Sequence, residues 1–132
     1  MFSRFSPASK RVLRAAEQEC RNRSHYYVGV EHVLLALLEE HDPAFEARLV
    51  ELGARPVDVH AEVRRSLGTG DERLWDGILL TPRVRTVVRL AEEGAGAGDV
   101  EPVHLLDAIV GEGGGLASEI LHRHISSYRA AD

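Results

Sequence analysis

The chain has 132 residues, of which 44% are hydrophobic and 28% charged, with a formal net charge of −5. This length and composition suit one ordinary globular domain with a sizeable core. The negative balance disfavours non-specific binding to nucleic acid or an anionic membrane, and no stretch of roughly 18 apolar residues could span a bilayer. The single Cys20 excludes an internal disulfide and fits a reducing, cytoplasmic location.

The apolar periodicity of the first half predicts four helices. Caps and glycine stops place them at about 7–23, from near Val30 onward, from Pro43 to Gly53, and from Pro56 to Gly68. The second of these is apolar on nearly all faces, so we expect it to be central and buried. No strand of useful length is expected, only a short extended segment around Tyr26 and Val28.

A connector is predicted at about 69–79, with Trp75 expected to pack back onto the domain. Three further helices follow, lined in turn by Val84, Val87, Val88 and Ala91, by Leu105, Leu106 and Ile109, and by Leu116, Ile120 and Leu121. Only eight residues come after His124, so a fourth helix should be vestigial or absent. The glycines of 94–98 and 113–115 predict loops or frayed ends, since each costs about 1 kcal/mol in a helix.

The two halves repeat one another. Ser6-Pro7 and Thr81-Pro82 each open a helix and lie 75 residues apart, while the apolar blocks 28–38 and 100–110 match at an offset of 72. A duplicated unit of this size predicts an all-α fold of tandem repeats. We assign repeat one to about 1–68 and a shortened repeat two to about 80–132.

The segments Met1–Ser6, Gly29–Leu37, Thr81–Arg83 and His104–Leu106 resemble the Clp repeat domain, the N-terminal domain of ClpA/ClpC-class AAA+ unfoldases. The resemblance covers about 1–125 and implies two four-helix repeats related by pseudo-two-fold symmetry. It also implies a non-enzymatic module that binds client proteins, degron peptides or adaptors for the unfoldase ring. No Gly-x-x-x-x-Gly-Lys-Ser/Thr phosphate loop occurs, so ATP hydrolysis is not expected. The Met1 start and the shortened second copy favour a free-standing protein.

In the ClpC branch, a Glu before the motif His of each repeat takes up the guanidinium of phosphorylated arginine. Glu31 matches this position, and a carboxylate can pair with a guanidinium in a two-pronged, charge-assisted way. Helix N-termini could supply amides for the phosphate, with Arg4, Ser6 and Val30 as further ligand-binding candidates. The alternative is that Glu31 is only a first-turn acid favoured by the helix dipole. Repeat two has Val103 at the matching position, so we expect one competent pocket at most.

Phe2 and Leu80 are the candidates for a protein- or peptide-binding surface. In ClpC-like domains a Phe at both positions forms part of a hydrophobic surface used by adaptors and by cyclic peptide antibiotics. Leu80 keeps an apolar contact there but loses the aromatic face. The alternative is that Phe2 and Phe5 only pin the N-terminus to the core.

No catalytic residue, cofactor or metal is expected. His32 and His104 occupy equivalent places and should make hydrogen bonds at helix starts, whereas His122 and His124 would point apart on a helix. Cys20 lies on an apolar helix face and should be a buried small hydrophobe. A second hypothesis is a regulatory or decoy protein whose ligand site has decayed. Such a protein would contact the unfoldase or its clients, or sequester antibiotics.

Overall fold

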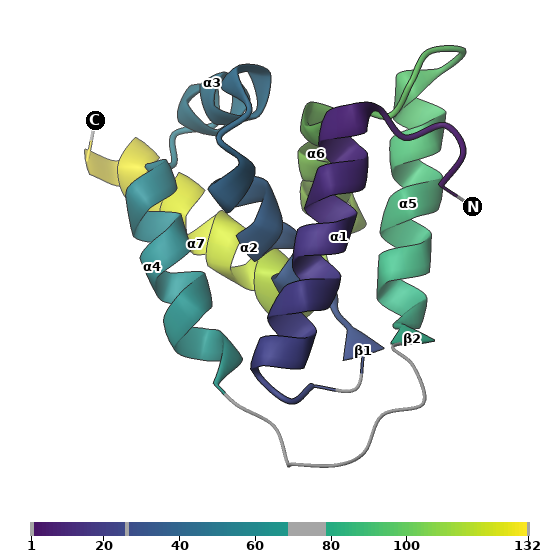
Figure 1. Cartoon of the computed structure of the whole chain (residues 1–132). Coiled ribbons are helices and arrows are strands. Elements are labelled where there is room, and N and C mark those ends of the chain that lie inside the picture. The colour runs from purple at the N-terminus through teal and green to yellow at the C-terminus, as the bar shows by residue number, and fades with distance from the viewer. Residues whose placement is uncertain (1, 26, 69–78, 132) are drawn as a thin grey trace.

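A computed structural model describes residues 2–25, 27–68 and 79–131, apart from the side chains of 79 and 126–131. These residues form seven helices and two short strands, arranged as an all-α fold (Figure 1). The elements are α1 (Pro7–Asn22), β1 (Tyr27–Val28), α2 (Val30–Glu40), α3 (Pro43–Glu51), α4 (Pro56–Leu67), β2 (Leu79–Leu80), α5 (Pro82–Ala95), α6 (Pro102–Glu112) and α7 (Gly115–Ala131). Repeat one comprises α1–α4 and repeat two α5–α7, so the second repeat is shortened as predicted. Trp75 and Tyr26 lie outside the described residues.

Three helices begin with the same local device. The side chains of Ser6, Asp42 and Thr81 each accept a hydrogen bond from the backbone N–H three residues later, at 3.1, 3.0 and 3.2 Å. A proline follows each cap, where its fixed φ suits the first turn and its missing N–H costs nothing. The sequence pattern therefore located these starts to the residue.

Helix α2 is the centre of the core. Eight of its residues are buried, among them Leu34 and Leu37, which are fully inaccessible. It packs against α1 and α4 of its own repeat and against α7 of the other, and it also touches α5 and α6 of that second repeat (Figure 1). One apolar cluster therefore runs through both repeats, which confirms the prediction of a central, buried helix.

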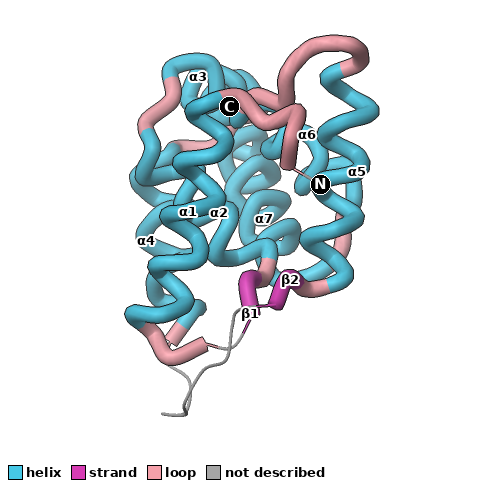
Figure 2. Tube along the Cα trace, turned by 45° about the vertical axis from the view of Figure 1, so that its right-hand side comes forward, coloured by secondary structure: helices cyan, strands magenta, loops and turns pink. Residues whose placement is uncertain are grey.

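Backbone hydrogen bonds pair segments of one repeat with segments of the other. Strand β1, which leads into α2, pairs in parallel with β2, which leads into α5 (Figure 2). At the opposite end, Phe5 and Val100 form a parallel bridge in which Val100 N–H donates to the Arg4 carbonyl at 2.7 Å. The segment before the first helix of each repeat thus lies beside the segment before the second helix of the other. Runs this short have no alternating pattern to reveal them in the sequence.

The glycines of repeat two behave differently from expectation. Gly94 lies inside α5, because the buried face formed by Val84, Val87, Val88 and Ala91 outweighs the propensity cost of one exposed glycine. The chain does break at Gly113, whose φ of 76° ends α6, but Gly115 already starts α7. A Cβ at Gly114 would overlap the Arg83 guanidinium, which also pairs with Glu112 at 2.6 Å. The start of α7 is thereby fixed beside the start of α5.

Within the described residues, no helix has both the length and the apolar character needed to cross a membrane.

Replacing Leu34 by Ala should lower the free energy of unfolding by about 2–5 kcal/mol, because it leaves a cavity where α2 meets both repeats. Val57→Ala is the control: that side chain is 78% exposed and should change stability by less than about 0.5 kcal/mol. Urea denaturation monitored by circular dichroism measures both. Equal effects would contradict the central role of α2.

Candidate functional site

Glu31 lines a small open pocket. It is the second residue of α2 and is partly exposed. The pocket has a volume of about 160 Å³ and is bounded by the α1–β1 loop, the start of α2, the end of α4 and the start of α7. Its lining residues are His25, Tyr27, Glu31, His32, Ser66, Leu67 and Leu116. The site therefore draws walls from both repeats.

Gly29 leaves room for the Glu31 carboxylate. A Cβ at Gly29 would lie 2.6 Å from Glu31 Oε2, so the carboxylate folds back over the start of its own helix. That position also suits a first-turn acid interacting with the helix dipole. Both interpretations of Glu31 made from the sequence are therefore compatible with its geometry.

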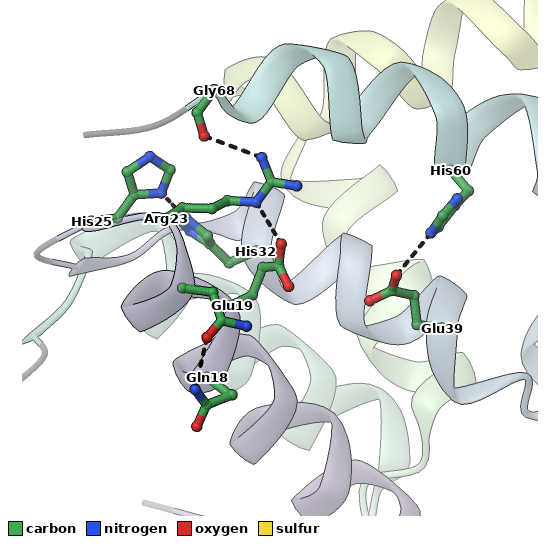
Figure 3. A network of polar contacts seen from close by, with 9 residues as sticks. Gln18, Glu19, Arg23, His25, His32, Glu39, His60 and Gly68 are labelled. Atoms are coloured by element: carbon green, nitrogen blue, oxygen red, sulfur yellow. Dashed lines mark hydrogen bonds and ion pairs between the residues drawn. The ribbon is translucent and has the colours of Figure 1, made fainter.

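Two histidines link the loop before β1 to the start of α2. The Gly29 backbone N–H donates to His32 Nδ1 at 2.9 Å, so His32 caps the helix as predicted from its position. His32 Nε2 lies 2.7 Å from His25 Nδ1, and the rings meet edge to face (Figure 3). His104 makes the equivalent bond in repeat two, accepting from Glu101 N–H at 2.9 Å.

Burial keeps these imidazoles neutral. Desolvation, reinforced by the neighbouring His25 and Arg23, lowers the pKa of His32 from 6.5 to about 4. Desolvation followed by the charge of Arg23 also lowers the pKa of His25. Arg23 itself pairs with Glu19 and donates to the Gly68 carbonyl at 3.1 Å, which ties the end of α1 to the end of α4 (Figure 3). The pocket walls are thus held by polar contacts on two sides.

Arg4 and Ser6 do not meet Glu31. The Arg4 guanidinium donates to the carbonyls of Gly96 and Gly98 just beyond the end of α5, whereas Glu31 follows β1, which lies at the start of α5. The 14 residues of α5 separate these two places by about 20 Å. Ser6 is buried and caps α1. Both residues lie beside the start of α6, because the segment before α1 pairs with the segment before α6.

Val30 faces away from the pocket. Its side chain is 4% exposed and lines an apolar depression between α1 and α5. Val30 is the first residue of α2, so it can offer a ligand only its backbone N–H, because first-turn amides have no intrahelical acceptor. The sequence argument missed His25, Leu67 and Leu116, whose place in the pocket depends on which helix ends meet.

Neither Phe2 nor Leu80 lines the apolar depression between α1 and α5. Phe2 is half-buried and packs edge to face on the buried Phe5 at 5.1 Å between ring centroids. Leu80 is also half-buried and directly precedes α5. The depression is lined by Phe5, Ser9, Val12, Leu13, Val30, Val33, Val84, Val87, Val88 and Leu105. Its accessible space, about 10 Å³, holds no more than one water.

The histidines and Cys20 make other contacts than those of a metal site in the described residues. No group of three or more His, Cys, Asp and Glu within them is close enough to hold a metal ion. His124 pairs instead with Glu62 at 2.7 Å. Cys20 is fully buried, and burial raises the pKa of its thiol to about 12, which removes its nucleophilic form at neutral pH.

Sequence comparison relates most of the chain to one family. The family described as "Clp repeat (R) N-terminal domain" matches residues 4–98. Chaperone protein ClpB of Oceanobacillus iheyensis is 31% identical over 92% of this chain. The negative regulator of genetic competence ClpC/MecB of Bacillus subtilis is 32% identical over 92% of it. The chain spans 15% of the length of each of these relatives.

Structural comparison supports the same architecture. The N-terminal domain of the caseinolytic protease associated chaperone ClpD from Arabidopsis thaliana has a TM-score of 0.67 and 20% identity, covering 99% of this chain and 96% of that one. A structure described as part of a malarial protein secretion system has a TM-score of 0.75 and 16% identity, covering 98% and 92%. At these identities the likeness shows the fold alone.

The neutral His32 makes stability depend on pH. Because its pKa falls from 6.5 to about 4 on folding, the unfolded chain takes up this proton first as the pH drops. The contribution of neutral His32 to the free energy of unfolding is complete above pH 6.5. It is lost as the pH falls from 6.5 to about 4, which lowers that free energy by on the order of 3 kcal/mol. Urea denaturation across this window measures the loss.

The matched control is His32→Gln, because a Gln at this helix position can accept from the same N–H without titrating. Carboxylates titrate in both proteins, so the difference between the two pH profiles reports His32 together with its hydrogen-bonded partner His25. Identical profiles would contradict a neutral, buried His32.

Proposed function

The chain belongs to the family of Clp repeat N-terminal domains, and we propose that it is a non-enzymatic module that binds client segments, degron peptides or adaptor proteins for a Clp unfoldase. The observation that carries the proposal is an ionisable pocket residue, Glu31, at an open site built from both repeats. A partly exposed carboxylate beside unpaired helix-start amides offers an acceptor and donors within one small pocket.

This chemistry suits a phosphorylated arginine side chain. The Glu31 carboxylate would take the guanidinium, and the backbone N–H groups of Val30 and Glu31 would face the phosphate, with the helix dipole favouring negative charge there. The apolar walls Leu67 and Leu116 would cover the methylene stem. Arg4 and Ser6 belong instead to the surroundings of the α6 start.

Repeat two lacks the acid that the proposal needs. Val103 stands in the first turn of α6 at the place of Glu31, and its side chain has no charge to offer a guanidinium. Phosphoarginine binding is therefore assigned to repeat one alone, with one molecule bound per chain.

Titration of a phosphoarginine peptide by calorimetry tests the pocket. Glu31→Gln keeps the side-chain shape and should weaken binding roughly 10- to 100-fold, because it removes charge-assisted hydrogen bonds. Glu101→Gln in the segment before α6 is the matched control and should leave affinity within about twofold. Equal affinity of wild type and Glu31→Gln, or no binding by either, would refute the assignment.

We propose a second, apolar contact surface along the depression between α1 and α5. Phe2 packs on Phe5, which lines the depression, and Leu80 directly precedes α5, so these two side chains would contact a partner side chain or a cyclic peptide antibiotic lying across the two helices. Both side chains are partly exposed and therefore accessible to a partner. Adaptor proteins are the other class of partner for this surface.

Leu80→Phe should strengthen binding of a hydrophobic cyclic peptide severalfold, because an added ring contributes about 0.5–1.5 kcal/mol in an edge-to-face or stacked contact. Phe2→Ala should weaken it. Val57→Ala, distant from α1 and α5 in the chain and well exposed, is the control and should have no effect. Fluorescence anisotropy of the labelled peptide measures the three affinities. An affinity of Leu80→Phe equal to that of the wild type would contradict this surface.

A regulatory or decoy role is the second candidate function. It is favoured by one observation: repeat two has Val103 where repeat one has Glu31, and the nearby Arg4 guanidinium is already engaged with the Gly98 carbonyl beyond the end of α5. Such a protein would compete for antibiotics or contact the unfoldase or its clients directly. Binding of purified unfoldase in the absence of any client would favour this role over client delivery.

A further inference from the structure

The wall of the Glu31 pocket contains two imidazoles hydrogen-bonded in series. His32 Nδ1 accepts from the Gly29 N–H, so its proton must reside on Nε2. His32 Nε2–H then donates to His25 Nδ1 at 2.7 Å, which places the His25 proton on its own Nε2. The two rings have one tautomeric arrangement in which both contacts are hydrogen bonds.

The two hydrogen bonds in this series cannot both persist if either imidazole takes up an additional proton. A proton added to His25 Nδ1 would face the His32 Nε2–H, leaving two donors in contact. If His32 instead moved its own proton to Nδ1, that proton would face the Gly29 N–H. Protonation of either ring therefore breaks one of the two bonds that join the loop to α2.

The loop held by these bonds is backbone-strained. Ser24 has a φ of 57°, a left-handed conformation that a residue with a Cβ adopts at a cost. The backbone N–H of His25 donates to the Cys20 carbonyl at 2.8 Å, which continues the attachment to α1. When the His25 side chain loses its contact with His32, this turn can relax away from the pocket.

The surroundings of the pair oppose protonation. Burial lowers the pKa of both rings, and Arg23 lowers it further, whereas Glu19 on α1 and Glu31 on α2 raise the pKa of His25. The walls contributed by α4 and α7 are Ser66, Leu67 and Leu116, which carry no charge. His25 is the more accessible ring and so is the point at which a proton enters.

We propose that His25 and His32 form a proton-operated latch that holds the Glu31 pocket in its ligand-binding shape near neutral pH and releases the loop at Arg23–His25 in mild acid. The proposal rests on the assignment of Glu31 as the ligand-binding residue. It adds regulation of that site by pH. The Val84 amide supplies an internal reference, because it donates to the Thr81 hydroxyl at the start of α5, and that hydroxyl does not titrate.

Nuclear magnetic resonance of the ligand-free chain tests the latch itself. At neutral pH the ring nitrogens should report His32 protonated at Nε2 and His25 also at Nε2. Between about pH 6.5 and 4, exchange of the Gly29 amide should accelerate roughly fivefold relative to the Val84 amide, after correction for intrinsic exchange. The opposite His32 tautomer, or parallel behaviour of the two amides, would overturn the proposal.

Two variants separate the latch from general destabilisation. His25→Gln keeps an acceptor for His32 Nε2–H and does not titrate, so Gly29 exchange should lose its pH dependence while remaining slow. His25→Phe keeps a ring but no acceptor, so exchange should be fast at every pH. Far-ultraviolet circular dichroism checks that both fold. A pH dependence in His25→Gln equal to that of wild type would also overturn the proposal.

Ligand binding provides the second arm. The ratio of wild-type to His25→Gln affinity for one phosphoarginine peptide, measured at about pH 7.5 and about pH 5, cancels the titration of the peptide. We expect this ratio to fall severalfold at the lower pH, and a constant ratio would contradict regulation of the pocket. Absence of binding by both proteins at both pH values would refute the proposed function, whereas the exchange measurements would still decide the latch.

Discussion

The backbone pairing between the repeats is the constraint on which the rest of the structure depends. Because β1 lies against β2 and Phe5 bridges to Val100, the start of each second helix is built beside the other repeat. Helix α2 can then pack against elements of both halves and become the common core. The Glu31 pocket inherits this arrangement, since its carboxylate comes from α2 and one of its apolar walls from α7.

The helices can be predicted from the sequence because the signals that determine them are local. Caps followed by proline, and apolar residues at three- to four-residue spacing, need no knowledge of the rest of the chain, and α1, α3 and α5 begin where these signals stand. The pairing between repeats depends on two-residue strands without a pattern. For that reason the sequence argument grouped Arg4 and Ser6 with Glu31, although they lie at the other end of α5.

The site was predictable to the same extent. The helix-start role of His32 follows from its position in the first turn, and the hydrogen bond to Gly29 confirms it. The role of His25 does not follow, because its contact with His32 depends on a left-handed turn at Ser24, a residue type that gives no such signal. Leu67 and Leu116 reach the pocket through tertiary packing, which periodicity cannot report.

The pairing of leading segments between the repeats also relates this chain to a symmetric dimer. A solitary repeat would present the backbone groups of its two leading segments, the one before its first helix and the one before its second, without the partners they have here. A second copy of the same repeat, related by two-fold symmetry, would supply both sets at once. The present chain is thus equivalent to a homodimer closed into one polypeptide. Within one polypeptide the two halves can carry different residues at matching positions, here Glu31 and Val103, whereas identical subunits encoded by one gene cannot.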